Sequence, residues 1–410
     1  MPFIVDLHIH SKYSRATAKD MDIENLVKWA KIKGVGMLGS GDFTHPAWLA
    51  ELEKKLSPKS PGVYDHDGVD FILTGEVSNI YFKAGRTRKV HNIIAVPDFE
   101  TAEEAAEALS DYGDLDSDGR PIMHLECDRM VKMLFGINPD ILVIPAHAWT
   151  PHFSIFGSNS GFDSPAECFE GELSKIFSIE TGLSSDPEMN WRWSELDRFC
   201  LTSHSDAHSP HKIGREANVF KDNIDYPTLV DTLKTKDNKR FLYTIEFFPE
   251  EGKYHWDGHR ACGERLSPED AVRSDNLCPA CGKKLTIGVM HRLSSLADRP
   301  DGYVDKKSPR SRKLVPLAEI IGSALEVSPD SVSVGKEYFK MIKNFGTEFG
   351  VLLDAPEEAL REKCLPKVAQ GVINVRSGNL DIEPGYDGEY GKVNVLKDDG
   401  SHKEKQLSFL

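Results

Sequence analysis

The chain has 410 residues, of which 40% are hydrophobic and 28% are charged, and its formal net charge is −15 at pH 7. These totals predict a large folded domain with one or two smaller modules. No run approaches the roughly 18 uninterrupted apolar residues of a membrane span, so a membrane protein is excluded. The acidic excess argues against binding nucleic acid through bulk charge, although a local basic groove stays compatible with it.

Short apolar segments alternate with helix-period segments from Phe3 to about Phe248. This alternation is typical of repeated strand–helix units and a mostly parallel sheet. The predicted strands are Phe3–His10, Val35–Phe43, Asp70–Ile80, Lys89–Val96, Ile141–Ala148, Phe177–Gly182, Cys200–Ala207 and Phe241–Phe248. We expect Asp22 to cap a helix over Ile23–Lys33, Thr101 to cap a second helix, and Asp225 to precede a third. The pattern predicts an α/β fold with enough strands for a barrel.

The pattern changes after Phe248, where a segment rich in Gly, Cys and His begins. We predict four parts: a metal-dependent catalytic domain over residues 1–249, a zinc-binding module over 250–298, a C-terminal α+β domain with possible DNA contacts over 299–400, and a flexible tail over 401–410. Residues from Leu317 to Val375 are predicted to be helical, and Arg376–Val395 to form strands and turns.

Two pairs of metal-ligand residue types lie near opposite ends of the predicted barrel sequence. In Asp6-Leu-His8-Ile-His10, the two histidines are two residues apart on a strand, so both rings leave the same face and can bind one ion. The pair Asp206-Ala-His208 repeats that spacing. Because the carboxyl ends of barrel strands converge, we expect both pairs to contribute to one site.

Further acid and imidazole groups stand at or near the ends of other apolar runs, namely Asp42, His45, Glu76, His91 and His147. Each one taken alone is compatible with an ordinary core or loop residue. Their occurrence together at successive strand ends predicts a multi-metal site instead.

These residues carry a resemblance to the PHP family of phosphoesterases. The match covers roughly the first 250 residues, at His8, His10, Glu76, His91, His147, Asp206 and His208. The resemblance implies a distorted barrel of about seven strands with two or three divalent ions. Arg15 departs from the common pattern, as does Gly-Asp42-Phe-Thr-His45, which leaves open whether Asp42 or His45 serves a third ion.

The resemblance also assigns roles within the metal site. Glu76 is the expected bridging carboxylate, with His91 and His147 completing the neighbouring ion, and Glu76, His147 and Asp206 are the expected catalytic residues. Mixed nitrogen and oxygen ligands suit Zn²⁺ or Mn²⁺ better than Mg²⁺. Closely spaced divalent ions activate water and stabilise the attacking and leaving oxygens of a phosphoryl transfer.

A second metal site is predicted in the cysteine-rich segment. His259-x₂-Cys262 and Cys278-x₂-Cys281 form two knuckles with the spacing of a closed, tetrahedral zinc site. His255 is close enough in sequence to replace His259 as the fourth ligand, although the x₂ spacing favours His259. We expect this zinc to be structural, because the segment is too short to build its own core.

The order of these parts resembles the endonuclease Q family, from the catalytic body through Cys278-Pro-Ala-Cys281-Gly to Gly385-Tyr-Asp-Gly-Glu-Tyr-Gly391. That resemblance implies an endonuclease that cuts DNA 5′ to uracil, hypoxanthine, xanthine or an abasic site. The aromatic segment from Trp149 to Phe156 is a candidate for contacting an extruded base. The alternative is a PHP phosphatase acting on a small phosphomonoester, and a further one is a non-catalytic DNA adaptor.

The two ends of the chain lead to predictions about location and partners. The first residues lack the features of a signal peptide, so we expect a cytoplasmic protein. The tail Lys405-Gln-Leu-Ser-Phe-Leu410 resembles the short motif by which bacterial repair proteins bind the sliding clamp, which is therefore a predicted partner.

Overall fold

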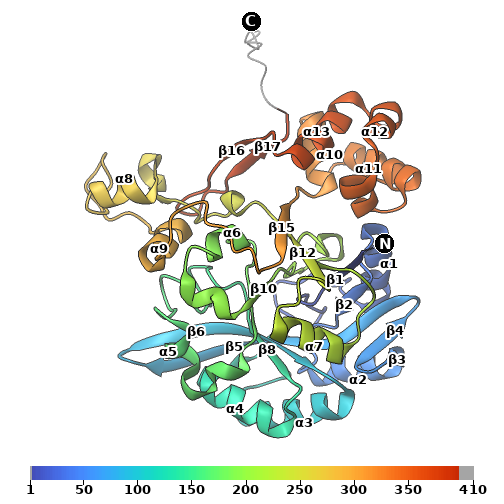
Figure 1. Cartoon of the computed structure of the whole chain (residues 1–410), viewed down its shortest axis with the longest axis vertical. Helices are drawn as coiled ribbons and strands as arrows, with labels where there is room; N and C mark the ends of the chain where they lie inside the picture. Colours follow the sequence, from blue (N-terminus) through green and yellow to red (C-terminus); the bar gives the residue numbers. More distant parts are fainter. Residues whose placement is uncertain (1, 397–410) are drawn as a thin grey trace, which may run out of the picture. The chain divides into compact units, whose positions relative to one another are not determined.

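The computed structural model describes residues 2–396 and has a mixed α/β fold (Figure 1). It divides into two compact units, one formed by the described chain up to Leu314 together with Pro384–Gly391, and the other by Val315–Glu383 together with Lys392–Leu396. The proposed domain boundaries at residues 249 and 298 are not tested by this division and stay predictions. The tail with the predicted clamp motif lies outside the described residues.

The catalytic body is built on a sheet that starts with three parallel strands. These are β1 (Phe3–Asp6), β2 (Met37–Gly39) and β5 (Val69–Lys83). β5 continues antiparallel into β6 (Arg86–Val96), which pairs with β8 (Leu142–Pro145). The β5–β6 hairpin is the longest pairing and carries two of the predicted metal ligands, Glu76 and His91.

Hydrogen bonds continue this sheet into a ring. β9 (Ser178–Glu180) and β10 (Cys200–Thr202) form a parallel pair. The Ala148 amide donates to the Glu180 carbonyl at 3.0 Å, which joins the end of β8 to β9. The His10 amide donates to the Ala207 carbonyl at 3.0 Å, which joins the chain after β10 to the chain after β1. These bonds do not contradict the predicted distorted barrel, and they lie beside the predicted ligands His10, His147 and Asp206.

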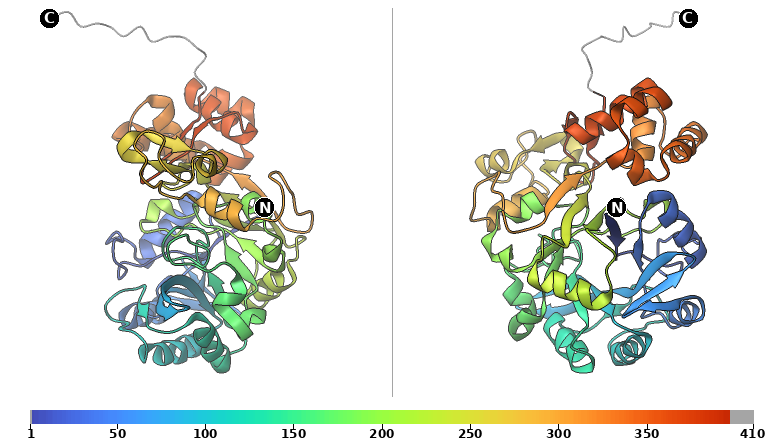
Figure 2. Two further views of the ribbon diagram at one scale, coloured as in Figure 1. Left: turned by 90° about the vertical axis from the view of Figure 1, so that its left-hand side faces the viewer. Right: turned by 45° about the vertical axis from the view of Figure 1, so that its right-hand side comes forward.

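Helices surround these strands (Figures 1 and 2). The larger ones are α1 (Ile23–Lys33), α2 (Pro46–Lys55), α3 (Phe99–Ser110), α4 (Cys127–Ile137) and α7 (Tyr226–Thr235), and the short ones are α5 (Pro165–Phe169) and α6 (Pro187–Asn190). Asp22 and Asp225 cap α1 and α7 as predicted. The prediction that Thr101 caps α3 is wrong: Asp98 is the cap and accepts a hydrogen bond from the Thr101 amide, because helix formation already begins at Phe99.

Most strands are shorter than the apolar runs that predicted them, whereas β5 and β6 are longer. β1 ends at Asp6 and β10 ends at Thr202, so the ligand-bearing residues after each strand lie in irregular chain. Strands that alternation did not indicate are β3 (Ser57–Ser60), β4 (Val63–His66), β7 (Ile122–Met123) and β11 (Ala217–Phe220). β11 pairs antiparallel with β1 and with β12 (Phe241–Glu246).

The body has a continuous apolar core inside the strands and under the helices. Val5, Met37, Ile72, Ile93 and Ile144 are among its buried members and come from β1, β2, β5, β6 and β8. Ile72 and Glu76 are four residues apart on β5, and Ile93 and His91 are two apart on β6, so each ligand points to the same face as its apolar neighbour and is supported by the core.

The rest of the first unit contains small elements around the predicted zinc ligands. These are β13 (Asp257–His259), β14 (Glu264–Leu266), α8 (Pro268–Arg273), α9 (Val289–Leu296) and β15 (Arg310–Lys313). β15 pairs in parallel with β12 and so belongs to the main sheet. The buried apolar cluster of this segment consists of Leu266, Ala271, Cys278 and Leu285. Such a small core fits a segment whose folding depends on a bound metal.

The second unit is mainly helical, as predicted for Leu317 to Val375. Its helices are α10 (Leu317–Leu325), α11 (Val332–Phe345), α12 (Glu357–Lys363) and α13 (Pro366–Ser377), with a π-helical turn at Gly350–Asp354. Strands β16 (Asp381–Glu383) and β17 (Lys392–Asn394) pair antiparallel, in the segment predicted to form strands and turns. Among the described residues no helix is long and apolar enough to cross a membrane.

Candidate metal centre

Four predicted ligands come together in a first group: His8, His10, Glu76 and Asp206. His10 Nε2 lies 3.3 Å from Glu76 Oε2 and 3.1 Å from Asp206 Oδ1. His8 Nε2 lies 3.5 Å from Glu76 Oε2 and 3.6 Å from Asp206 Oδ1. The two histidines follow β1, Glu76 lies on β5, and Asp206 follows β10. The predicted convergence of distant strand ends is therefore seen for these four residues.

A second group consists of Glu76, His91 and His147. Glu76 Oε1 lies 2.8 Å from His91 Nδ1 and 3.2 Å from His147 Nε2, and the two ring nitrogens are 3.2 Å apart. Glu76 thus directs one carboxylate oxygen to each group. This is the arrangement expected of a carboxylate that bridges two ions.

Carboxylates behind the first group fix the orientation of its histidines. Glu180 accepts a hydrogen bond from His8 Nδ1 at 2.9 Å, and Asp42 accepts one from His10 Nδ1 at 3.0 Å. When each ring carries a single proton, on Nδ1, its Nε2 lone pair faces the other ligands. Glu180 also accepts from the His147 amide at 2.6 Å, so it links both groups.

The predicted ligands Asp42, His45 and His208 are placed outside the two groups. Asp42 accepts hydrogen bonds from the Ser11 amide and hydroxyl as well as from His10, so its oxygens are engaged behind the site. His45 occupies the N-cap position of α2 without a side-chain capping hydrogen bond, and its ring stacks on that of Tyr13 with centroids 4.4 Å apart. His208 lies close by, with its ring centroid 4.4 Å from that of His10. The structure therefore brings together two groups of candidate metal ligands that share Glu76.

The residues present fit divalent cations. His8 Nε2 is buried and has no hydrogen-bond partner, although it faces carboxylates of the first group. Burial lowers the pKa of His8, but the negative charges of Glu180, Glu76 and Asp206 outweigh it and raise the pKa well above its ordinary value. Burial lowers the pKa of His91 to about 4, so that ring is neutral. A buried set of carboxylates and imidazoles of this kind is a site for cations.

Strained backbone supports the site. His147 has φ +31 and Asp206 has φ +47, a region that residues with a Cβ rarely adopt. Gly182, itself at φ +64, passes so close that an added Cβ would lie 2.6 Å from the Cβ of His147. Such strain is maintained where the surrounding structure holds a functional side chain in place.

Two residues near the metal groups were missed by the sequence analysis, Glu180 and Arg120. Glu180 lies two residues before the end of the predicted strand Phe177–Gly182 and is the last residue of β9, so its position near a strand end was the available signal. Arg120 Nη1 donates to Glu76 Oε2 at 3.1 Å from a loop between α3 and β7. The local pattern around Arg120 contains no such signal.

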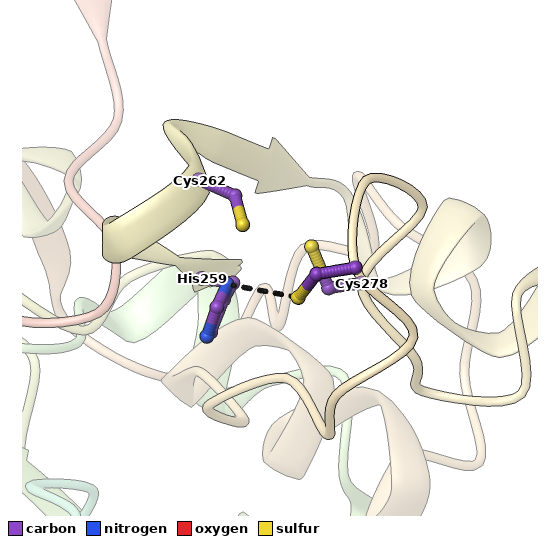
Figure 3. A group of neighbouring side chains, drawn as sticks. His259, Cys262 and Cys278 are labelled. Atoms are coloured by element: carbon purple, nitrogen blue, oxygen red, sulfur yellow. Dashed lines mark hydrogen bonds between the residues drawn. The ribbon is translucent and has the colours of Figure 1, made fainter.

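The four predicted zinc ligands His259, Cys262, Cys278 and Cys281 also form one group. Figure 3 shows the side chains of His259, Cys262 and Cys278 turned toward one another. His259 Nδ1 lies 3.6 Å from Cys281 Sγ. His255 is buried apart from this group, so the geometry selects His259 from the two candidates.

The Gly385–Gly391 motif braces the zinc group. Asp387 accepts hydrogen bonds from the Arg260 amide at 2.6 Å and from the Thr286 hydroxyl at 2.5 Å. The Trp256 amide donates to the Gly385 carbonyl at 2.9 Å. The motif is thus packed against the chain on both sides of the first knuckle.

The aromatic segment after His147 has mixed burial. Trp149 and Phe156 are buried, and the Trp149 indole donates to Asn190 at 2.8 Å, so both rings belong to the core rather than to a base-contacting surface. Phe153 is only partly buried, has φ +59, and lies 4.9 Å from the His91 ring. Phe153 is therefore the one aromatic ring of this segment that stands beside the metal groups and keeps exposed surface.

Two of the similar solved structures cover nearly the whole chain. The novel lesion-specific endonuclease PfuEndoQ from Pyrococcus furiosus is 32% identical, with a TM-score of 0.87 over 99% of this chain and 98% of that one. An endonuclease Q in complex with a 27-mer duplex substrate, with an abasic lesion at the active site, is 32% identical, with a TM-score of 0.86 over the full length of both chains.

Comparison with known sequences adds two findings. The uncharacterized protein YqxK of Bacillus subtilis is 31% identical over 407 residues, which are 95% of this chain and 98% of that protein. Residues 316–379 match a family model described as the MJ0043 C-terminal domain. The similarity to these proteins therefore covers both compact units.

Proposed function

The chain belongs to the endonuclease Q family of DNA repair endonucleases, and from this premise we propose that it nicks duplex DNA on the 5′ side of uracil, hypoxanthine, xanthine and abasic sites. It is a hydrolase of phosphodiester bonds. The solved relative carries an abasic lesion at its active site, which supports a damaged nucleotide as the substrate of this chain.

The observation that carries the proposal is the position of Glu76 between two groups of ligands. One oxygen faces His8, His10 and Asp206, and the other faces His91 and His147. When bound, paired divalent ions supply an activated water and stabilise both the attacking and the leaving oxygen of a phosphodiester. The chain's own part is to hold five side chains in fixed positions around one carboxylate.

We propose Zn²⁺ or Mn²⁺ for the two groups and Zn²⁺ for the His259 group. Imidazole nitrogens and carboxylate oxygens are mixed in the first two groups, whereas Mg²⁺ prefers oxygen ligands. Three thiolates with one imidazole in a closed group are typical of structural zinc.

Phe153 is the proposed contact for the damaged base. Enzymes that inspect a single base extrude it from the helix, and extrusion costs least at a mismatched or missing base. An exposed aromatic face beside the metal groups can stack on a base or fill the gap that it leaves. Trp149 and Phe156 are excluded from this role by their burial.

The test uses purified protein with Mn²⁺ or Zn²⁺ and duplexes that differ in a single deoxyuridine, deoxyinosine or abasic site. We expect one metal-dependent nick 5′ to the lesion, mapped on a denaturing gel, and no nick in the undamaged duplex or with Asp206→Ala. Cleavage of a small phosphomonoester without any DNA nick would move the assignment to a phosphatase.

A further inference from the structure

We propose that Arg120 is a catalytic residue that contacts the phosphate being cut. This inference rests on the proposed function and names a further residue for it. Arg120 Nη1 donates to Glu76 Oε2 at 3.1 Å, on the oxygen that faces the first ligand group. Its side chain keeps 26% of its surface exposed, so an incoming molecule can reach it.

The charge of Arg120 is out of place in a site made only to bind cations. An arginine cannot ligate a metal, and it stays protonated in proteins. Ions bound between Glu76 and the histidines compete with the guanidinium for Glu76 Oε2 and repel it. A phosphodiester is the anion that the proposed reaction brings to this position, and a guanidinium matches two of its oxygens with parallel hydrogen bonds.

The loop that carries Arg120 is fixed on both sides of it. The Gly119 amide donates to the Tyr13 carbonyl at 3.1 Å, and the Ser78 amide donates to the Pro121 carbonyl at 2.9 Å. Gly119 also passes close to the ligand shell, since an added Cβ would lie 2.4 Å from Asp42 Oδ2. These contacts bring a surface loop onto the rim of the metal groups and leave Arg120 pointing at Glu76.

Asp118 is a positioning residue for this loop and accounts for Arg15, which departs from the family pattern. Asp118 Oδ1 accepts from the Arg120 amide at 3.1 Å and from the Arg15 amide at 3.1 Å. Arg15 Nε lies 3.4 Å from Asp118 Oδ2. Arg15 thus joins the chain after β1 to the Arg120 loop instead of binding an ion.

The competing explanation is that Arg120 only neutralises Glu76 in the metal-free protein. The two explanations differ in what a substitution changes. A counter-ion for Glu76 affects metal content and folding, whereas a phosphate contact affects the rate at unchanged metal content and responds to chemical changes at the phosphate. The experiment therefore measures both properties on the metal-loaded full chain.

The variants are Arg120→Gln and Arg120→Lys, with Arg129→Gln as the matched control because Arg129 is 71% exposed on α4. For each, metal content and melting temperature are measured beside the single-turnover rate on a saturating lesion duplex. Phosphorothioate diastereomers at the scissile position report on contacts to each non-bridging oxygen. The same proteins are assayed on bis(4-nitrophenyl) phosphate, a diester that contains no DNA.

We expect Arg120→Gln to keep its metal and lose roughly 10²- to 10³-fold in rate, as for removal of one preorganised donor to a developing charge. Arg120→Lys should recover part of the rate. One of the two phosphorothioate diastereomers should reduce the rate of the wild type by a larger factor than it reduces the rate of Arg120→Gln. A wild-type rate in Arg120→Gln overturns the proposal, and so does a loss of metal that matches the loss of rate. If the protein cuts the small diester but no lesion duplex, the proposed lesion substrate is wrong. The rates of wild type and Arg120→Gln on the small diester then test the role of Arg120 separately.

Discussion

At the scale of single residues, the metal groups depend on carboxylates that lie behind the histidines as well as on the ligands themselves. Glu180 accepts from His8 Nδ1 and from the His147 amide, so one buried side chain orients one histidine of each group. Asp42 does the same for His10. Such outer carboxylates fix the ring tautomer and orientation of metal-binding histidines.

Glu180→Gln should therefore weaken metal binding while preserving the shape of the side chain. The amide is uncharged and is a weaker acceptor for His8 Nδ1, so we expect the affinity for the catalytic ions to fall by about 10- to 100-fold. Competition with a chelator measures that affinity. Glu107→Gln, at an exposed position of α3, is the control, and equal affinities in the two variants would contradict the role of Glu180.

The sequence predicts the ligand set better than it predicts the surroundings of the ligands. His8 and His10 follow from their spacing on one strand, and Asp206 from its position at a distant strand end. Asp42 was predicted as a possible ligand, but its oxygens face His10 and Ser11. Arg120 reaches Glu76 only because hydrogen bonds to Tyr13 and Ser78 shape its loop, and such long-range contacts leave no mark in local sequence.

At the scale of structural elements, the segment 149–163 is held beside the metal groups by three arginines. Arg86 and Arg88 both donate to the Gly161 carbonyl. Arg292 on α9 donates to the Phe156 carbonyl at 3.0 Å and to the Phe162 carbonyl at 2.8 Å. Arg86 and Arg88 are thus engaged with a carbonyl group of the protein itself, and Arg292 connects α9 to the segment that carries Phe153.

Arg292→Ala should loosen this segment without removing the ions. Three hydrogen bonds of the guanidinium are lost, including one to Asp163 at 2.6 Å, and the freed carbonyl groups are partly buried. We expect faster amide exchange over residues 149–163 and a lower nicking rate at unchanged metal content. Unchanged exchange in that segment would show that Arg292 is not what holds it.

The end of β12 contains a buried carboxyl group that should make the stability of the fold depend on pH. Burial raises the pKa of Glu246 well above its ordinary value, and the nearby charge of Asp186 acts in the same direction. Glu246 Oε2 accepts from the Thr181 hydroxyl, while Oε1 has no partner. A raised pKa in the folded state means that folding favours the protonated acid. The free energy of unfolding should therefore fall as the pH rises above about 4.5, the ordinary pKa, towards the raised pKa of the folded state.

Glu246→Gln should therefore stabilise the protein at alkaline pH and have less effect at acid pH. The amide resembles the protonated acid, and each pH unit between the two pKa values is equivalent to about 1.4 kcal/mol. Melting temperatures of wild type and variant, compared from about pH 5 to about pH 9, measure the difference. A difference that is constant with pH would mean that Glu246 is ionised in the folded protein.

Element boundaries were predicted less well than element types. α1 and α7 begin where their aspartate caps indicate, because capping is a local interaction. β1 and β10 end several residues before the apolar runs do, because the chain after each strand turns to present ligands rather than to pair. β11 was missed because it joins the sheet through antiparallel pairing with β1, a contact made over long range.

At the scale of the whole molecule, a chain with net charge −15 acts on a polyanion. Part of the acidic excess lies in the metal groups and the carboxylates behind them, where bound cations would offset it. The general α/β class, the clustering of His259 with the three cysteines and the helical character of the second unit could all be predicted from sequence, since periodicity and residue spacing are local. The division into units at Leu314 could not, because β15 pairs with β12 across the intervening zinc segment.

Glu76 is proposed to join two ions into one centre that cuts DNA. The most direct test is to count metal ions per chain by mass spectrometry in the wild type and in Glu76→Ala, and to assay both proteins on a lesion duplex. We predict three ions in the wild type, one of them the zinc at His259, loss of metal from both catalytic groups in Glu76→Ala, and loss of nicking with it. A Glu76→Ala protein that keeps all the metal of the wild type and still nicks the duplex would contradict the account.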